Sequence, residues 1–242
     1  MTAIKTKDLT KQYKDTCAVN SLDLEIEEGE LFSLLGVNGA GKTTTIKMLS
    51  CLTEPSKGDA FLLGYSITES PDEVKRIIAV SPQETAIAPG LSGKENLELI
   101  CGVHGFGKEK TNAKIAELQT LLGLTPIMKR RAGKLSGGWQ RRLSIAMALI
   151  SEPKILFLDE PTLGLDVIAR SELWDIIRSL KGRVTVVLTT HYMEEAEALS
   201  DRIGIMKDGR LLIADTAEGI KKMTGEEKFE NAFISIVRGA RI

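Results

Sequence analysis

A glycine-rich run near the N-terminus has the residue types that hold phosphate groups. Residues 36–43 read Gly-Val-Asn-Gly-Ala-Gly-Lys-Thr, which fits the pattern G-x-x-x-x-G-K-[ST]. Glycines allow the backbone to curl so that its N–H groups converge on phosphate oxygens, in front of the positive end of the following helix. Lys42 would then reach the β- and γ-phosphates, and the Thr43 hydroxyl would ligate Mg²⁺. The run lies between a predicted buried strand, residues 31–35, and a helix-forming stretch, which is the context that this motif requires.

Two carboxylates follow a second apolar run. Residues 155–158 read Ile-Leu-Phe-Leu and are followed by Asp159 and Glu160. At the carboxyl edge of a parallel sheet, Asp159 can face Mg²⁺, and Glu160 can polarise a water for in-line attack on a γ-phosphate. Taken alone, the pair also fits a solvated strand end. Downstream of a phosphate-binding loop, the catalytic interpretation is favoured.

A second run with phosphate-binding character lies near the middle of the chain. Residues 135–140 read Leu-Ser-Gly-Gly-Trp-Gln and precede a helical stretch, residues 141–150. The Ser136 hydroxyl and the N–H groups of Gly137 and Gly138 would then stand at a helix N-terminus, which attracts anions. The run also fits an ordinary loop and helix cap. Because it cannot easily reach the phosphate held by residues 36–43, we expect it to serve a phosphate bound by another copy of the chain.

The elements that must position these residues alternate in type along the chain. Period-two apolar residues Leu22, Leu24 and Ile26 predict an antiparallel region, and unbroken apolar runs predict buried parallel strands. Between residues 93 and 151 the apolar spacing becomes helical, so the parallel core is split by a helical insertion. The predicted fold is α/β: a P-loop NTPase core with a mainly parallel sheet, an N-terminal antiparallel β-subdomain and an inserted helical subdomain. Further expected elements are strands at residues 77–80 and 184–188, a hairpin at residues 203–206 and 211–214, and one short helix after Gly225.

Composition narrows the class of protein. The chain has 242 residues, 43% of them hydrophobic and 27% charged, which is typical of a globular protein with a sizeable core. The net charge of -1 offers no bulk basicity for a nucleic-acid backbone, so no nucleic-acid partner is expected. Three widely spaced cysteines indicate neither a disulfide framework nor a zinc site. No apolar run approaches the ~18 residues that span a bilayer, so we expect any membrane-spanning part to belong to another chain.

Together the motifs resemble those of the ATP-binding cassette (ABC) ATPases. Residues 135–139 are similar to the family's LSGGQ signature, and the resemblance extends over nearly the whole chain. It implies that Tyr13 stacks on adenine, that Gln83 contacts magnesium and the attacking water, and that His191 contacts the γ-phosphate. Residues 164–166, Gly-Leu-Asp, look like the loop that crosses to a second subunit.

The resemblance implies a full set of site residues. The nucleotide-binding residues are Tyr13, Gly36, Asn38, Gly39, Ala40, Gly41, Lys42, Thr43, Thr44, Ser136, Gly137, Gly138 and Asp166; the catalytic residues are Glu160, His191 and Gln83; and the magnesium ligands are Thr43, Gln83 and Asp159.

Two residues depart from the family's pattern. Trp139 takes the place of the final Gln of the signature, which puts only that side chain's contacts in doubt. Leu163 stands where the family more often has a small or polar residue. We expect neither residue to touch the hydrolytic centre.

The resemblance also implies the organisation and function of the chain. Residues 1–242 would form one nucleotide-binding domain, with residues 1–85 and 152–225 as the catalytic core, 86–151 as the helical subdomain and 226–242 as a C-terminal tail. The protein would bind ATP and Mg²⁺ and hydrolyse ATP to energise an ABC transporter. Its partners would be separate transmembrane permease subunits and a second ABC ATPase subunit, identical or paralogous, at the cytoplasmic face of the membrane.

Details of the sequence favour an exporter over other members of the family. Residues 163–166, residues 193–196 and the tail at residues 230–233 look most like exporters of drugs, peptides, lipids or polymers. Two other classes stay open: a soluble ABC ATPase acting on nucleic acid or ribosomes, and an ATP-driven signalling or mechanical module at a membrane partner. Soluble relatives generally carry long coiled-coil insertions or two cassettes, which this chain lacks.

Overall fold

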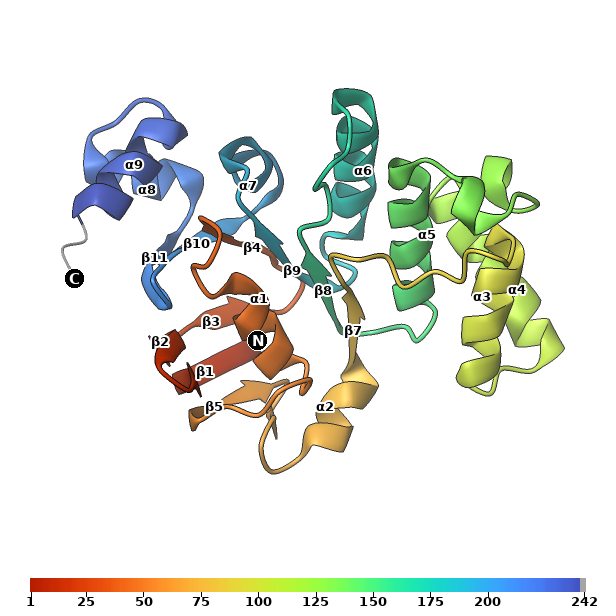
Figure 1. Ribbon diagram of the computed structural model, residues 1–242, viewed down its shortest axis with the longest axis horizontal. Helices are drawn as coiled ribbons and strands as arrows, with labels where there is room; N and C mark the ends of the chain where they lie inside the picture. The colour runs from red at the N-terminus through yellow and green to blue at the C-terminus, as the bar shows by residue number, and fades with distance from the viewer. Residues whose placement is uncertain (240–242) are drawn as a thin grey trace.

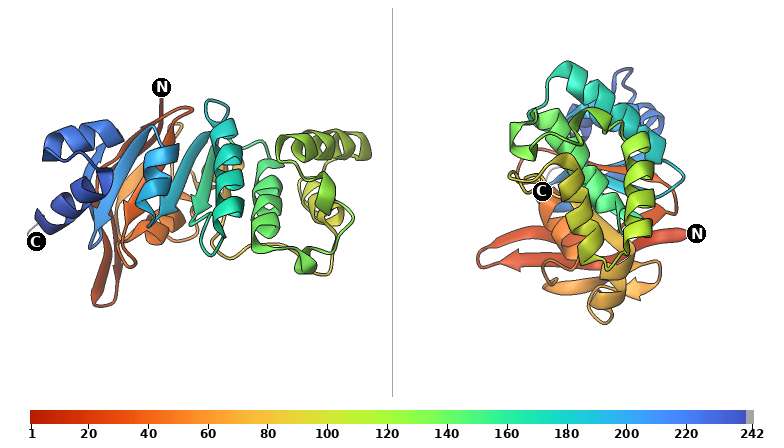
Figure 2. Two further views of the ribbon diagram at one scale, coloured as in Figure 1. Left: turned by 90° about the horizontal axis from the view of Figure 1, so that it is seen from above. Right: turned by 90° about the vertical axis from the view of Figure 1, so that its right-hand side faces the viewer.

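A six-stranded sheet and a five-stranded sheet form the middle of the molecule, with the helices of residues 93–149 at one end and those of residues 217–239 at the other (Figures 1 and 2). The computed structural model describes residues 1–239. The strands are β1 (Thr2–Tyr13), β2 (Thr16–Leu22), β3 (Glu25–Glu27), β4 (Leu31–Gly36), β5 (Lys57–Leu62), β6 (Tyr65–Ser66), β7 (Ile78–Ser81), β8 (Ile155–Asp159), β9 (Thr185–Thr190), β10 (Arg202–Lys207) and β11 (Arg210–Asp215). The helices are α1 (Lys42–Leu49), α2 (Pro71–Ile77), α3 (Gly93–Val103), α4 (Lys108–Leu121), α5 (Gly137–Leu149), α6 (Val167–Leu180), α7 (Met193–Leu199), α8 (Ala217–Thr224) and α9 (Phe229–Gly239), with short 3-10 turns η1 (Thr125–Ile127) and η2 (Ala132–Lys134).

The six-stranded sheet places the functional segments side by side. Its order is β11-β10-β4-β9-β8-β7, and all neighbours except β11 and β10 are parallel. Every residue of β4, β8 and β9 is buried, as expected for strands covered on both faces. Because parallel strands end at one edge, β4 delivers the glycine-rich loop beside the ends of β8 and β9. The predicted parallel core is confirmed.

The five-stranded sheet is antiparallel and differs in one detail from the prediction. The long strand β1 pairs with β2, β3 and β5, and β5 pairs with β6. Leu22, Leu24 and Ile26 do not share one strand: Leu22 ends β2 and Ile26 lies in β3. The Thr6 side chain fills the break, because its hydroxyl donates to Leu22 O (2.7 Å) and accepts from Leu24 N (2.8 Å).

The helical insertion lies at one end of the molecule, between β7 and β8 in the chain (Figure 1). Buried side chains of α3, α4 and α5, such as Leu97, Leu118 and Leu143, belong to the same hydrophobic cluster as Leu156 and Leu188 of the sheet. The insertion therefore packs onto the sheet.

Helices α8 and α9 are the last two elements of the described chain and lie at the opposite end of the molecule (Figure 2). The left-handed conformation of Gly225 (φ 73°) ends α8, and α9 is the short helix predicted after it. Phe229 and Phe233 of α9 pack against Leu35 and Ile205 of the sheet. Residues 240–242 of the predicted tail lie outside the described residues. Over residues 1–239, no helix has both the length and the apolar character to cross a membrane.

Candidate active site

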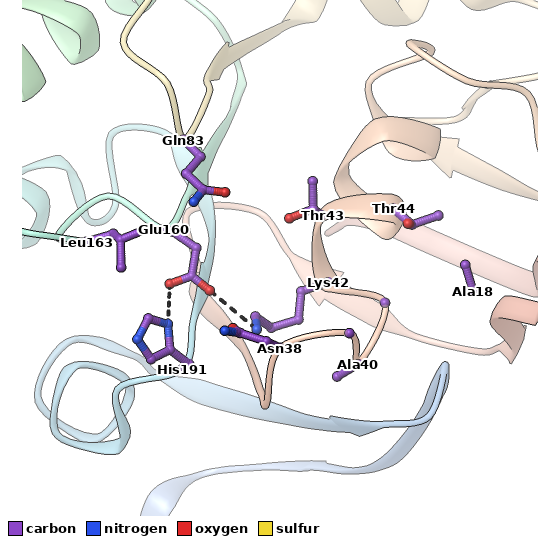
Figure 3. Close-up of a pocket in the computed structure, with 12 residues that line it drawn as sticks. Ala18, Asn38, Ala40, Lys42, Thr43, Thr44, Gln83, Glu160, Leu163 and His191 are labelled. Atoms are coloured by element: carbon purple, nitrogen blue, oxygen red, sulfur yellow. Dashed lines mark hydrogen bonds and ion pairs between the residues drawn. The ribbon is translucent and has the colours of Figure 1, made fainter.

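A cavity of about 460 Å³ opens where the glycine-rich loop meets the ends of β8 and β9 (Figure 3). It is lined by Ala18, Asn38, Gly39, Ala40, Gly41, Lys42, Thr43, Thr44, Gln83, Glu160, Leu163 and His191. The structure thus gathers ten of the predicted site residues from four separate segments of the chain.

The loop between β4 and α1 needs glycine for reasons of space and conformation. A Cβ atom on Gly36 would lie 2.5 Å from Met206 O. Gly41 has φ +102°, and a Cβ atom there would lie 2.4 Å from Ala18 O. Any larger residue at either position would push the loop away from β10 or β2, so the tight curl of the loop beside the cavity depends on these glycines.

The Lys42 ammonium is fixed inside this curl. Its Nζ donates to Gly36 O (2.7 Å) and Val37 O (3.3 Å) and lies 3.3 Å from Glu160 Oε1. The Lys42 side chain is only 5% exposed. A buried charge held at the first turn of α1 supplies a strong positive field, which is what phosphate binding requires.

The Glu160 carboxylate lies between Lys42 and His191 (Figure 3). Its Oε2 accepts from His191 Nδ1 at 2.7 Å, because an ionised carboxylate has no proton to donate. The Glu160 backbone is left-handed (φ 49°), a conformation that non-glycine residues adopt at a cost. The Glu160 N–H donates to Thr189 O (3.2 Å) and Thr189 Oγ1 (3.0 Å), which hold the turn in place. With this backbone turn, the Glu160 carboxylate lies within reach of both Lys42 and His191.

Asp159 and Thr43, which lines the cavity, are joined by a hydrogen bond. Thr43 Oγ1 donates to Asp159 Oδ1 at 3.0 Å, and Thr189 Oγ1 donates to the same atom at 2.6 Å. Thr189 was not among the residues expected from the sequence, although it contacts both members of the carboxylate pair. The sequence feature that could have identified Thr189 is its place near the end of β9, two residues before His191.

Gln83 lines the cavity, and its backbone is held by helix α5, which follows the signature residues 135–136. Arg141 of α5 donates to Pro82 O and Gln83 O, both at 2.6 Å. Burial lowers the pKa of Arg141, and the charge of Asp159 opposes that change. The sequence reasoning missed Arg141, which follows the signature run directly and ties residues 82–83 to the base of that helix.

The signature residues line a separate hollow of about 280 Å³. Its lining residues are Ser136, Gly138, Trp139, Arg142, Asp166, Ile168, Ala169 and Glu172. Ser136 is the N-cap residue of α5, but its side chain makes no capping hydrogen bond. The Asp166 carboxylate caps α6 by accepting from Ile168 N (3.0 Å) and Ala169 N (2.9 Å). Residues 136–138 therefore stand apart from the first cavity, as expected if they serve another copy.

The expectation for Leu163 is wrong, and the stacking of Tyr13 on adenine stays a prediction. Leu163 does line the cavity, because the left-handed turn at Glu160 folds the chain back, with Leu163 N donating to Glu160 O (3.2 Å). Tyr13 lies at the end of β1, within the antiparallel sheet, and is 44% exposed. It is not among the cavity-lining residues; instead, Lys11 Nζ lies 5.1 Å from its ring centroid.

Comparisons with known proteins agree with this geometry. The family described as ABC transporter matches residues 19–163. The daunorubicin/doxorubicin resistance ATP-binding protein DrrA of Streptomyces peucetius is 42% identical over 92% of this chain and 68% of its own length. The probable multidrug ABC transporter ATP-binding protein YbhF of Escherichia coli (strain K12) is 37% identical over 98% of this chain and 42% of its own length.

Solved structures support the same assignment. An ATP-binding subunit of an ABC transporter superposes with a TM-score of 0.84 and 26% identity, covering 97% of this chain and 99% of that one. The dimeric, post-hydrolysis ATP-binding cassette MJ0796, bound to ADP and Pi, gives a TM-score of 0.78 and 28% identity over 88% of this chain and 98% of its own. The predictions of fold, family and ATPase activity are confirmed, and this chain belongs to the ABC transporter family as an ATP-binding and ATP-hydrolysing subunit.

Proposed function

We propose that Glu160 is the general base of ATP hydrolysis, with His191 and Lys42 holding its carboxylate in place. The observation that carries this role is the position of that carboxylate, 2.7 Å from His191 Nδ1 and 3.3 Å from Lys42 Nζ at the cavity wall. A water beside Glu160 would be polarised for in-line attack on the γ-phosphate, and the proton would pass to the carboxylate. His191 would contact the γ-phosphate through its other ring nitrogen.

Residues 36–44 would hold the phosphates of ATP, and the oxygen atoms of Thr43, Asp159 and Gln83 would face Mg²⁺. Oxygen-only ligands are those that Mg²⁺ prefers, and it commonly takes one or two carboxylates together with phosphates and waters. The convergence of Thr43 and Thr189 hydroxyls on Asp159 Oδ1 fits this set, because it fixes the carboxylate's orientation. When bound, the metal neutralises charge that develops on the phosphate oxygens.

A second ABC ATPase subunit would complete the site. Ser136, Gly137 and Gly138 are separate from the cavity of their own chain, and Ser136 leaves its hydroxyl out of its own helix cap. They would bind the γ-phosphate held by the partner, with Asp166 crossing nearby. The related cassette MJ0796 is a dimer, which supports this arrangement. ADP would leave residues 136–138 without a phosphate, so hydrolysis would open the dimer.

We further propose that the subunit energises export of drug-like compounds through separate permease subunits. DrrA and YbhF are named for drug resistance and multidrug transport, respectively. The segment at Gln83, with helices α3 to α5 beside it, would form the permease docking surface and hold the subunit at the cytoplasmic face of the membrane. In this scheme residues 1–85 and 152–225 form the catalytic core, residues 86–151 the helical subdomain and residues 226–242 the tail.

A pull-down from native membranes tests this function. Tagged Glu160→Gln protein is loaded with ATP and Mg²⁺, and the retained proteins are identified, with Lys42→Ala as the control that should not form the ATP-bound dimer. Recovery of a stoichiometric multi-span protein, only with Glu160→Gln, would support the transporter assignment. Recovery of ribosomal or other soluble partners alone would overturn it in favour of a soluble ABC ATPase. Drug export in reconstituted vesicles then separates a transporter from a signalling module.

A further inference from the structure

Side chains of helix α6 contact helix α7 and its N-cap residue Tyr192 at regular intervals. The contacting residues are four apart on α6 and three apart from Tyr192 onward, which is the pairing of surface rows that packs one helix along another. The contacts join the Arg170 guanidinium carbon to the Tyr192 ring centroid (4.7 Å), Trp174 Nε1 to Glu195 Oε1 (3.1 Å) and Arg178 Nη2 to Ala198 O (3.5 Å). We call these six residues the α6–α7 clamp.

Of the two helices of the clamp, α7 starts beside the active-site cavity and α6 starts at the separate hollow that contains Ser136. Helix α6 begins directly after Asp166, which caps it, and α7 begins two residues after His191. The contacts run in the same order along both helices, so the helices are parallel and their first turns lie together. Arg170 joins the first turn of α6 to Tyr192, directly before α7, and Trp174 joins the two helices one turn further on.

Glu195 is the polar centre of the clamp. It is 0% exposed; its Oε1 accepts from Trp174 Nε1, and none of residues 1–239 donates a well-formed hydrogen bond to its buried Oε2. The Thr162 hydroxyl, two residues after Glu160, is likewise buried and unpaired. Burial raises the pKa of Glu195 above its ordinary range, and the nearby hydroxyls of Thr190 and Thr162 oppose that rise without reversing it.

An unpaired carboxyl oxygen inside the protein costs free energy, and an apolar side chain would fill the same space without that cost. Packing alone therefore does not account for Glu195. The neighbours of Glu195 do account for it. Thr190 directly precedes His191, Thr162 lies two residues after Glu160, and Trp174 lies on the helix that Asp166 caps. One side chain thus lies near the segments that follow Glu160 and precede His191, and contacts the helix that Asp166 caps.

We propose that Trp174 and Glu195 are positioning residues that hold His191 against Glu160 by clamping helix α7 to helix α6. The inference rests on the proposed roles of Glu160 and His191 and adds the part of the chain that sets their separation. Because α6 also starts at Asp166, the clamp links the loop that faces the second subunit to the catalytic histidine.

The two histidines of the chain make a direct test possible. In a His104→Gln background, ring ¹⁵N NMR of labelled protein reports His191 alone, free of any need for turnover. Glu195→Leu keeps the volume but removes the hydrogen-bond acceptor, and Trp174→Phe keeps aromatic packing but removes the donor. Glu195→Gln keeps an acceptor for the indole and is the rescue variant. Ile176→Val, a core change on α6 outside the clamp, is the control for a general loss of stability.

We expect Trp174→Phe and Glu195→Leu to move the His191 Nδ1 resonance and to lower kcat about tenfold or more with little change in KM for ATP. Glu195→Gln and Ile176→Val should leave both near wild type. If Glu195→Leu does not fold, the His191 resonance of Trp174→Phe alone tests the clamp. An unmoved resonance in folded Trp174→Phe would overturn the clamp whatever happens to hydrolysis. A moved resonance with unchanged kcat would support the clamp and overturn the proposed role of His191 instead.

Discussion

His191 Nδ1 lies 2.7 Å from Glu160 Oε2, although the two residues come from the ends of different strands. Each constrains the other: the carboxylate selects the ring nitrogen that carries the proton, and the ring fixes the carboxylate's orientation. The parallel pairing of β8 with β9 makes this contact possible, since Asp159 and Thr189 are directly paired just before it.

Replacement of Glu160 by Gln should nearly abolish hydrolysis and leave ATP binding intact. The amide keeps the shape of the side chain but cannot take a proton from water, so kcat should fall by about 10²- to 10⁴-fold. Phosphate release measures kcat, and light scattering with ATP measures the dimer, which should accumulate. Wild-type turnover in the purified variant would remove Glu160 from the role of base.

Lys42→Ala should weaken nucleotide binding itself. It deletes the ammonium at the centre of the loop and leaves Glu160 buried with one ion-pair partner fewer, so affinity should fall roughly 10- to 100-fold. Titration calorimetry with ATP measures the loss. Lys47→Ala is the matched control, because Lys47 lies on the same helix and is exposed. Equal effects of the two substitutions would show that general charge, not the loop geometry, governs affinity.

Thr189→Val should impair catalysis while preserving the fold. Valine has nearly the same shape, but the Asp159 carboxylate and the Glu160 N–H each lose a partner. We expect a roughly 10- to 100-fold loss in activity or in apparent Mg²⁺ affinity, as when an outer partner of a metal ligand is removed. Thr185→Val changes the same strand at its far end, where its hydroxyl accepts from Gly29 N. A comparable loss in that control would assign the effect to the strand as a whole.

Arg141→Met should loosen the segment that carries Gln83. Methionine fills the space but donates no hydrogen bonds, so Pro82 O and Gln83 O lose their partners. Amide exchange at residues 83–85 should become faster, and kcat should fall more than ATP affinity. Unchanged exchange would show that the sheet alone holds this segment.

Glu195→Gln should change how stability depends on pH. Burial raises the pKa of Glu195 in the folded state, so the native protein binds its proton more tightly than the unfolded chain does. The contribution is fully present below the unfolded pKa and is lost as pH rises toward the folded pKa. The variant cannot ionise, so its free energy of unfolding should exceed that of wild type increasingly as pH rises above about 4.5. Urea unfolding at several pH values measures this, and parallel curves would contradict it.

The sequence alone was enough to identify the family and to predict most of the residues that line the cavity. Residues 36–43, the carboxylates after residue 158 and the run at 135–139 carry their chemistry in residue type and local spacing, which do not depend on distant contacts. Unbroken apolar runs likewise indicated buried parallel strands, because burial on both faces leaves no polar alternation.

Only the tertiary structure decided which side chains meet. Thr189 and Arg141 were not predicted, because a threonine in a strand and an arginine in a helix look ordinary until strand order and helix packing bring them to Asp159 and Gln83. Leu163 lines the cavity because of the left-handed backbone turn at Glu160, and the residue type at that position does not indicate such a turn. In the sequence, Glu195 has the residue type expected on the exposed face of an acidic helix. It is buried against Trp174 because α7 packs on α6, which brings together residues 21 positions apart.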